Sequence, residues 1–549
     1  MTFSVRLKYF GFQEADYDSG YSHHSNFLRS WVLTLGQPEL KAPAVHKMGY
    51  GTELFIDDVC IQEMRGVKRL RHPATKLTQP VLSSDKPWEQ ARENQCSRVY
   101  LYGTVMFDEE MGKYRMWYMG RMGPQHGHTI PGLYVPRPTD GHSAMFMGSG
   151  QDRFGRAFVE NDVGDLTCYA ESEDGITWHK PPLNIFEFDD DGRNNIVWDF
   201  HGACIFKDKN VLHSEQRYKA IGFCRRYRNI FLLTSVDGIE WDDSQWLQPL
   251  LHRSNEGMFN ITWDSRQGLY RGYTLCQYKD GRRSICYSES RKLSGPWKEL
   301  RPMLLPQRQD DEVGKRKYGA IQGEYYNMSG FRYGNIHIGI LAALYVTAAQ
   351  VRRECRWTVL WTQCWPYSRD GANWHHFDTE RTPVIPRGEA GSFDCGMVMG
   401  VANEPLIEAD SIHWYYTGSR ETHGRSLKDK IMSIGRASWR LDGFVSLDAD
   451  ANGGVIKTVP LRLPNGQLQV NVDATKGSLT VEVLFPDGST QPGFSVEACT
   501  PIKGDHLRHT VSWTQIDLTQ AQQSLRLRFS LRWAKLYSFR IISYEAGAK

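Results

Sequence analysis

The stretch Glu173-Asp174-Gly175-Ile176-Thr177-Trp178 returns along the chain, and its repetition predicts the fold. Two further copies pair Asp-Gly with a tryptophan, a fourth is degraded, and the last has Phe in place of Trp. They read Val236-Asp237-Gly238-Ile239-Glu240-Trp241, Arg369-Asp370-Gly371-Ala372-Asn373-Trp374, Leu293-Ser294-Gly295-Pro296-Trp297 and Arg440-Leu441-Asp442-Gly443-Phe444-Val445. The five glycines lie 57 to 76 residues apart. Repeats of this size are typical of a modular array.

A β-hairpin explains the pattern, because Asp-Gly supplies the positive φ of a tight turn and the Trp begins the next strand. A strand-like run precedes each turn, and another β-rich pair lies upstream of it. The runs are Leu166–Glu171, Ile230–Val236, Arg283–Ser288, Thr358–Ser368 and Lys430–Ala437. Four strands and their loops fit each repeat. We therefore predict an all-β fold with a five-bladed β-propeller over residues 46–454; the alternative is a large β-sandwich with coincidental Asp-Gly turns.

Two segments flank the predicted propeller. Residues 1–45 form an N-terminal extension with weak periodicity, suited to wrapping the blades or to a contact in a homo-oligomer. The run Thr52–Ile61 is a good strand, placed to complete a blade or to close the ring. Residues 455–549 contain alternating runs separated by Gly, Pro and Asp turns, which predict a C-terminal β-sandwich. Scaffold support is its favoured role, and carbohydrate binding is the alternative.

The overall composition narrows the classes of partner. Lys and Arg number 66 against 63 Asp and Glu, so the formal charge of +3 gives no electrostatic case for nucleic acid or membrane. There is no run of 18 apolar residues and no signal-peptide core in the first 30 residues. Eleven cysteines without a C-x-x-C pair favour reduced, buried thiols over a disulfide framework or a zinc site. We expect a cytoplasmic protein, or a secreted one if a leader has been removed.

The order of the repeats carries a resemblance to a known superfamily. Five such blades followed by a β-sandwich resemble the furanosidase-type propeller glycosidases, which include glycoside hydrolase families 32, 43 and 68. The runs Leu54-Phe55-Ile56-Asp57-Asp58, Pro87-Trp88-Glu89 and Tyr100–Val105 also resemble bacterial proteins described as glycosidase-like. The resemblance implies a carbohydrate substrate and a catalytic propeller. The acidic motifs of the characterised families, Asn-Asp-Pro-Asn-Gly and Arg-Asp-Pro, are absent, so no catalytic residue is carried over.

Propeller geometry directs the search for a site. Ligands bind where the innermost strands begin, and the second strands end on that same face. The Asp-Gly turns lie on the opposite face, so Asp174, Asp237 and Asp370 are expected to be structural. Glycosidic cleavage needs one carboxylic acid and a second carboxylate as base or nucleophile. Glu324 is predicted as the acid and Asp394 as the base or nucleophile, with Glu256 and Asp199 in reserve; alternatively, each only satisfies loop amides.

The same positions offer candidates for substrate binding. They are Arg98, Arg121, His201, Asn260, Tyr326, Arg420, Glu421 and His423. The arginines are candidates to bind a substrate carboxylate bidentately; alternatively, they pair with the acids named above. The histidines suit sugar hydroxyls, although a lone histidine beside a glycine is more often structural.

A long insertion, Arg121–Asp165, falls between the second and third strands of the first repeat, on the ligand face. We interpret it as a pocket wall that favours exo-acting cleavage. The spacing of its His126, His128 and His142 matches no known metal site, so neither a metal site nor a cofactor is predicted, although a structural calcium ion on the axis is compatible with the fold. The sequence thus predicts a glycoside hydrolase acting on a terminal furanoside or acidic sugar. The alternatives are a sialidase-like or lyase-like enzyme and a non-catalytic glycan-binding propeller.

Overall fold

The computed structural model describes residues 45–90, 97–121, 150–151, 157–158, 165–188, 192–208, 214–224, 229–242, 251–252, 259–347, 359–423, 430–514, 516–521 and 524–543. Strands dominate this part of the chain, and its single α-helix is α1, Arg308–Tyr318. The predicted all-β class is confirmed. The predicted N-terminal extension, except for Val45, lies outside the described residues, as does most of the long insertion.

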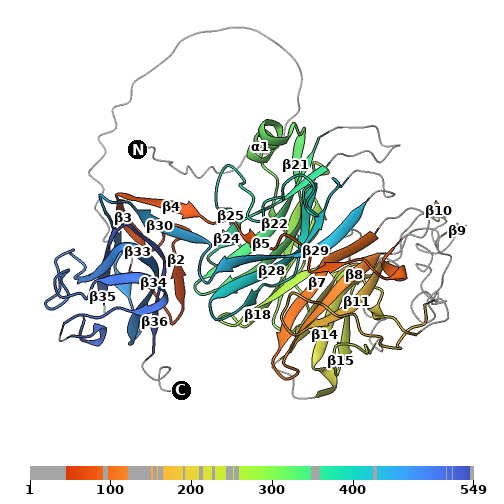
Figure 1. Ribbon diagram of the computed structural model, residues 1–549, viewed down its shortest axis with the longest axis horizontal. Helices are drawn as coiled ribbons and strands as arrows, with labels where there is room; N and C mark the ends of the chain where they lie inside the picture. The colour runs from red at the N-terminus through yellow and green to blue at the C-terminus, as the bar shows by residue number, and fades with distance from the viewer. Residues whose placement is uncertain are drawn as a thin grey trace, which may run out of the picture. The chain divides into compact units, whose positions relative to one another are not determined.

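Five groups of mostly antiparallel strands follow one another along the chain (Figure 1). Sheet one holds β7 Ser97–Asp108, β8 Lys113–Arg121, β11 Asp165–Ser172 and β12 Ile196–Trp198. Sheet two holds β13 Ala203–Lys207, β14 Tyr218–Cys224, β15 Asn229–Ser235 and β16 Leu251–His252. Sheet three holds β17 Asn260–Asp264, β18 Leu269–Gln277, β19 Arg283–Ser290 and β20 Arg301–Leu304. These are the four-strand units that the repeat predicts.

Sheet four holds β21 Gln322–Tyr333, β22 Ile336–Val346, β23 Val359–Cys364, β24 Pro366–Ser368 and β25 His375–His376. Sheet five holds β26 Met397–Val401, β27 Leu406–Ile407, β28 Ser411–Ser419 and β29 Ile431–Arg440. Its outer edge is formed by β5 Thr75–Lys76 and β6 Leu82–Ser83, which pair with β29. Because β29 also pairs with the start of β7, sheets one and five are joined.

One hydrophobic cluster takes side chains from all five sheets. Tyr102, Ile221, Ile261, Leu344 and Met399 each represent one sheet in it. Three of these five residues lie on the first strand of their sheet, as expected where inner strands converge. The shared core and the joining of the last sheet to the first fit a propeller-like fold; the number of blades stays a prediction.

The Asp-Gly turns have the structural role that the sequence predicts. The Oδ1 atom of Asp174 accepts hydrogen bonds from the backbone N–H groups of Ile176 and Thr177, at 2.8 and 2.7 Å. The same pattern recurs at Asp237 and Asp370. The glycines that follow have φ of 67°, 78° and 75°, which a residue with a Cβ adopts only at a cost.

Each of these turns is bound by an aromatic side chain of another sheet. Trp117 donates to the Gly238 carbonyl oxygen at 2.7 Å, and Tyr415 donates to that of Gly175 at 2.6 Å. Tyr273 donates to the carbonyl oxygen of Gly371 at 3.2 Å. The repeated turns therefore fasten neighbouring sheets to one another.

The last copy of the repeat forms a different structure. Asp442 itself has the positive φ, 60°, and its carboxylate is fully buried. It accepts hydrogen bonds from Tyr333, Arg508 and Ser538, the last at 2.6 Å. This copy connects sheet four to the C-terminal strands rather than to another repeat.

A second sheet system gathers strands from both ends of the described chain. It contains β1 His46–Lys47, β2 Thr52–Leu54, β3 Ile61–Arg65, β4 Val67–Arg71, β30 Val445–Ala449, β31 Gly454–Thr458, β32 Leu461–Arg462, β33 Gln467–Leu484, β34 Ile502–Thr510, β35 Ser524–Arg532 and β36 Ala534–Ile542. Its own core includes Phe55, Phe529 and Phe539. The expectation that Thr52–Ile61 completes a blade or closes the ring is wrong, because β2 pairs with β36. Strands from both sides of the predicted boundary at residues 454 and 455 share this sheet.

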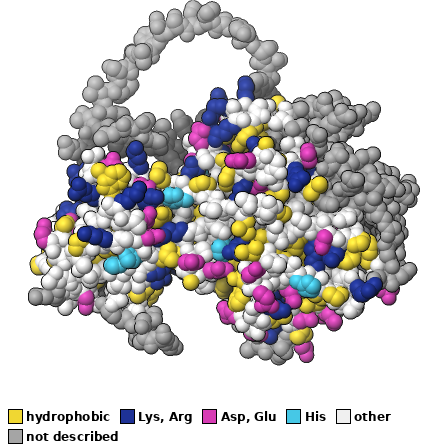
Figure 2. Space-filling model, in the orientation of Figure 1, with side chains coloured by type: hydrophobic (Ala, Val, Ile, Leu, Met, Phe, Trp, Pro, Cys, Tyr) yellow, Lys and Arg dark blue, Asp and Glu magenta, His cyan; other side chains and the backbone are white. Residues whose placement is uncertain are grey.

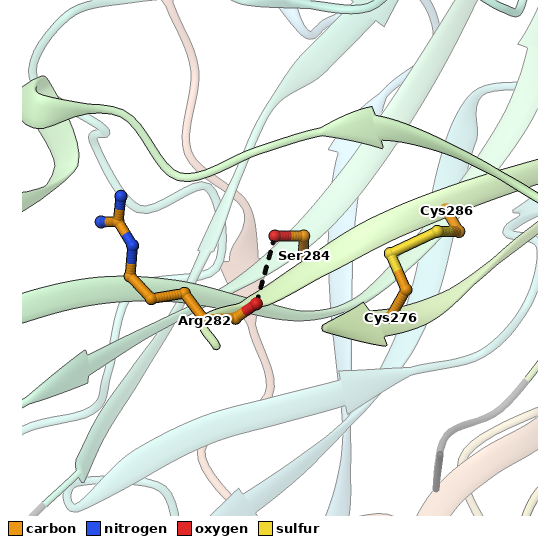
Figure 3. Close-up of a disulfide and its surroundings, with 4 residues drawn as sticks. All are labelled: Cys276, Arg282, Ser284 and Cys286. Atoms are coloured by element: carbon orange, nitrogen blue, oxygen red, sulfur yellow. Dashed lines mark hydrogen bonds between the residues drawn. A yellow bond between two sulfur atoms is a disulfide. The ribbon is translucent and has the colours of Figure 1, made fainter. Parts of the chain in front are cut away.

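Two cysteines form a disulfide, which the sequence analysis did not expect. Cys276 of β18 and Cys286 of β19 are joined, with Cα atoms 5.7 Å apart (Figure 3). Six other cysteines in the described ranges are free, and five of them are buried. The disulfide ties the two strands of a hairpin whose second strand begins at Arg283.

The visible surface is electrically mixed. Lysine and arginine side chains are interspersed with aspartate and glutamate on the face shown in Figure 2. In the part of the chain that the structure covers, no helix has the length and apolar character needed to cross a membrane.

Candidate active site

Three inner strands begin beside a phenylalanine that packs on a glycine of the next strand. The pairs are Phe200 with Gly222, Phe259 with Gly272, and Phe393 with Gly418. A Cβ on these glycines would come within 2.3, 2.1 and 2.7 Å of the ring, so the close packing requires glycine. The residue directly after each ring is a predicted site residue, namely His201, Asn260 or Asp394. These three predicted residues therefore share a place after a packed ring, but they lie two, one and four residues before the residue that pairs with the glycine.

His201 and Asn260 are both buried at these positions. The backbone N–H of His201 donates to the Phe223 carbonyl oxygen at 2.8 Å. The Nδ2 group of Asn260 donates to the Met328 carbonyl oxygen of sheet four, at 2.8 Å, while its Oδ1 atom is buried without a hydrogen-bond partner. Asn260 thus links the beginning of β17 in sheet three to the middle of β21 in sheet four.

Two tyrosines meet where the inner strands depart from regular pairing. The register of β7 with β8 shifts around Tyr102, and that of β21 with β22 shifts around Tyr326. The two rings are stacked with centroids 6.5 Å apart, and the His201 ring lies 5.9 Å from Tyr102. A third shift, in β26, contains Gly400, where a Cβ would come within 2.2 Å of the Tyr102 ring. Bulges redirect side chains and are common next to active sites.

Glu324 lies beside this tyrosine pair. Its side chain is 6% exposed and accepts hydrogen bonds from Arg283 and Gln322, at 2.7 and 2.6 Å. The Arg283 guanidinium lies 5.7 Å from the centre of the Tyr326 ring. The predicted acid and the predicted binding residue Tyr326 are therefore brought together by one arginine that the sequence analysis did not select.

Asp394 has a different set of partners. Its carboxylate accepts from Lys76 at 2.5 Å, from Tyr416 at 2.8 Å and from Ser392 at 3.1 Å, and the residue is 2% exposed. Lys76 belongs to β5, the outer edge of sheet five. Glu324 and Asp394 share no bonding partner, and the contacts of Asp394 lead outward across its own sheet.

Arg98, the second residue of β7, is 1% exposed, yet its Nε and Nη1 atoms have no hydrogen-bond partner. It lies two positions before Tyr100, so both side chains face the same side of the strand. The Tyr100 ring is 5.9 Å from that of Tyr102. Burying an ion without a partner costs roughly several kcal/mol, so an unpaired arginine here needs an explanation.

The remaining predicted residues are spread around the same end of the sheets. Asp199 is half-buried between β12 and β13. Arg420 is exposed and lines a cavity of about 310 Å³ together with Phe393. Glu421 and His423 follow β28, and the His423 carbonyl oxygen accepts a hydrogen bond from Lys430. Arg121 ends β8, but its side chain lies outside the described atoms, as does all of Glu256.

At the other end of the inner strands lies a motif that the sequence analysis missed. Asp108 and Asp264 end β7 and β17, and each is bound by an arginine seven residues later, Arg115 or Arg271. A cation of the following sheet completes each site, Lys207 at 2.6 Å or Arg332 at 3.0 Å. The signal was available as Asp-x-x-x-Gly-x-Tyr-Arg, which occurs at 108–115 and again at 264–271.

In the described part of the chain, no group of three or more His, Cys, Asp or Glu side chains is placed to hold a metal ion. The histidines at 126, 128 and 142 lie outside that part. The calcium ion compatible with the axis stays a prediction.

No protein-family model matches this sequence, and no curated protein matches it. Several solved structures are similar. An N-acetylgalactosamine deacetylase from F. plautii is 12% identical, with 69% of this chain and 97% of that one covered and a TM-score of 0.38. A thermostable family-43 glycoside hydrolase is 11% identical, with 62% and 89% covered and a TM-score of 0.34.

A family-62 α-L-arabinofuranosidase from Coprinopsis cinerea is 10% identical, with 67% and 97% covered and a TM-score of 0.37. Family 43 is one of the families that the sequence resembles, and a family-43 enzyme is among these structures. Likenesses at this level carry no information on activity, so the function has to be argued from the residues of the chain itself.

Proposed function

We propose that this protein is a glycoside hydrolase whose site lies around Glu324, where the inner strands begin. The observation that supports it best is a nearly buried carboxylate held by Arg283 and Gln322 beside a stacked tyrosine pair. The half-buried Tyr326 ring provides an aromatic surface for a sugar ring, and a fixed carboxylate provides the base or nucleophile that glycosidic cleavage needs. Because Arg283 and Gln322 each donate a hydrogen bond to one of its carboxyl oxygens, we assign Glu324 this role rather than that of the acid.

The proton donor in this proposal is Asp199, with Glu256 in reserve. Asp199 is half-buried and precedes Phe200, the ring that fixes His201. In the reaction, Asp199 gives its proton to the glycosidic oxygen as the bond from that oxygen to the anomeric carbon breaks. Glu324 either takes a proton from the attacking water or forms a glycosyl ester that water then cleaves. Asp394, tied to Lys76, holds sheet five together instead.

We propose further that the substrate carries a carboxylate on its terminal sugar. The unpaired nitrogens of Arg98 provide two N–H donors on the side of the strand that faces the tyrosines. A guanidinium binds a carboxylate bidentately, and the pairing would compensate its burial. Exo-acting cleavage stays part of the proposal, although the insertion that suggested it is outside the described residues.

Aryl glycosides with good and poor leaving groups test the roles of the acids. Glu324→Gln is expected to lose at least a hundredfold in kcat/KM for every leaving group. Asp199→Asn is expected to lose activity strongly only for poor leaving groups, because an activated aryl group departs without a proton. Asp394→Asn serves as the control, with a lower melting temperature but similar activity per folded molecule. Full activity of folded Glu324→Gln would contradict the assignment.

A matched pair of substrates tests Arg98. For a uronide and the neutral sugar of the same configuration, Arg98→Gln is expected to lower kcat/KM for the uronide roughly tenfold to a hundredfold, the loss of a charged hydrogen bond. The neutral sugar is expected to be unaffected. An equal loss for both would mean that Arg98 acts on folding only. An unsaturated product would instead favour the lyase-like alternative, and binding without turnover would favour a glycan-binding protein.

A further inference from the structure

A groove lies at the opposite end of the inner strands from the proposed active site. It has a volume of about 930 Å³ and is bounded by the second half of β7, by β13 and by the segment Asn403–Ile407. Sheets one, two and five therefore contribute its walls. The proposed glycosidase chemistry uses none of its residues.

One buried acceptor in this groove lacks a hydrogen-bond partner, and the carboxylate beside it has no cation among the described residues. Asn403 is 3% exposed, and its Oδ1 atom has no hydrogen-bond partner. The next residue, Glu404, accepts a hydrogen bond from Thr262 at 2.6 Å, and in the described part of the chain no lysine, arginine or histidine forms an ion pair with it. Burial raises the pKa of Glu404 above its usual value. Both groups would be satisfied by a ligand that donates hydrogen bonds.

The charges of the groove favour a positive ligand. Its lining carries two cations, Lys207 and Arg217, and four carboxylates. Glu110 is paired with Arg217 and Asp208 with Lys219, so Glu109 and Glu404 are the lining carboxylates without a cation in the described part of the chain. Both cations are already engaged, because Lys207 lies 2.6 Å from Asp108 and Arg217 is paired with Glu110. The protein therefore supplies no positive charge to Glu404.

Apolar side chains complete the lining. Phe107 is 45% exposed and Ile407 is 51% exposed, and both border the groove together with Leu406. Large exposed apolar side chains gathered at a concave site are typical of a binding surface. They would contact the hydrocarbon part of a ligand whose charged end reaches Glu404.

We propose that this groove is a second binding site, for a small organic ammonium ion. The ammonium group donates hydrogen bonds to Glu404 and to the Oδ1 atom of Asn403, and its alkyl body lies on Phe107 and Ile407. A bare metal ion would make no use of the apolar wall, and a neutral alcohol would leave the carboxylate without a cation. The site would bind amines independently of the glycosidase activity.

Binding of n-butylammonium chloride, followed by ligand-observed NMR titration, tests this site, with n-butanol and calcium chloride as comparison probes. We expect the wild-type protein to bind n-butylammonium at least tenfold more tightly than n-butanol. The substitution Glu404→Gln is expected to weaken n-butylammonium binding at least tenfold. The substitution Glu109→Gln, at an exposed carboxylate of the same groove, is expected to weaken it less than threefold.

Several outcomes would overturn the proposal. They are equal affinity for n-butanol, unchanged binding by Glu404→Gln, or no saturable binding of n-butylammonium. Calcium binding that disappears in Glu404→Gln would replace the amine site with a metal site. Thermal unfolding of each variant shows whether it is folded, and the isosteric change from Glu to Gln limits the disturbance. Asn403→Leu provides a second variant, expected to weaken n-butylammonium binding without changing the charge.

Discussion

The two ends of the inner strands differ in whether their buried charged side chains have partners. Where the strands end, Asp108 and Asp264 are fully buried and are bound by turn amides and by cations from two sheets. Where the strands begin, Arg98 is equally buried, but two of its nitrogens have no acceptor. Satisfied charges stabilise a fold, whereas an unsatisfied buried charge costs stability and is retained where function requires it. The comparison teaches that the charges of Asp108 and Asp264 connect neighbouring sheets, whereas the charge of Arg98 has no such partner and is the one that we assign to a substrate carboxylate.

Removing a buried carboxylate at the strand-end side is expected to have the largest effect. In Asp264→Ala the cation Arg332 would lose its carboxylate and Arg271 would keep only Glu289, and stranding buried charge typically costs about 3–5 kcal/mol. The free energy of unfolding, measured in urea, would fall by that amount. Burial raises the pKa of Asp264, but His337, Arg332 and Arg271 lower it further than burial raises it. The substitution therefore removes a negatively charged carboxylate.

Asp280→Ala is the matched control for this change. Asp280 caps an exposed hairpin turn, and within the described ranges its carboxylate accepts hydrogen bonds from Arg282 alone, so its removal is expected to cost less than about 1 kcal/mol. Equal losses for Asp264→Ala and Asp280→Ala would mean that the buried clusters do not carry the stability assigned to them.

A glycine pair tests whether the Asp-Gly turns fasten the sheets. Gly238 and Gly281 have nearly the same φ, 78° and 79°, but a Cβ on Gly238 would lie 2.9 Å from Trp117, whereas one on Gly281 would have no atom within 4 Å. Left-handed backbone costs about 1–2 kcal/mol for alanine at either site. The clash is expected to add about 1–3 kcal/mol at Gly238 only.

Thermal unfolding of Gly238→Ala and Gly281→Ala measures the difference. The first variant is expected to melt several degrees lower than the second. If both lost the same amount, backbone strain alone would account for the effect and the contact with Trp117 would contribute nothing.

How far the sequence could predict this molecule depends on the range of the interactions involved. The Asp-Gly turns were predictable because Asp174 bonds to residues two and three positions away. The pairing of β5 and β6 with β29 was not, because each strand has two residues and its partner lies at least 350 residues later. Thr52–Ile61 was misassigned for the same reason.

In the candidate site, too, short-range features were predictable from the sequence and long-range contacts were not. The sequence indicated which end of the inner strands to search, and His201, Asn260 and Asp394 each follow a phenylalanine that packs on a glycine of the next strand. It could not show that Asp394 is bound by Lys76, 318 residues away, or that Glu324 is bound by Arg283. Nor does any sequence pattern reveal that Arg98 is buried without an acceptor, since that depends on every side chain around it.

The smallest expected effect concerns the exposed carboxylates of the turns. Backbone hydrogen bonds from Thr177 and Ile176 lower the pKa of Asp174 to about 2. Because the folded pKa lies below the unfolded value of about 4, the stability that this carboxylate contributes is complete above pH 4 and is lost as the pH falls through 2. Asp174→Ala should therefore cost about 1 kcal/mol at pH 7, comparable to the loss of a helix cap, and much less near pH 2. Urea titrations of the wild-type protein and of Asp174→Ala, from pH 7 to about pH 2, measure the difference between their free energies of unfolding, which is expected to shrink as the pH falls. If this difference in the free energy of unfolding stayed constant with pH, the loss would be assigned to the backbone of the turn and not to the Asp174 carboxylate. Of the carboxylates at the strand-end side, the buried ones, Asp108 and Asp264, would then be the ones that contribute to stability.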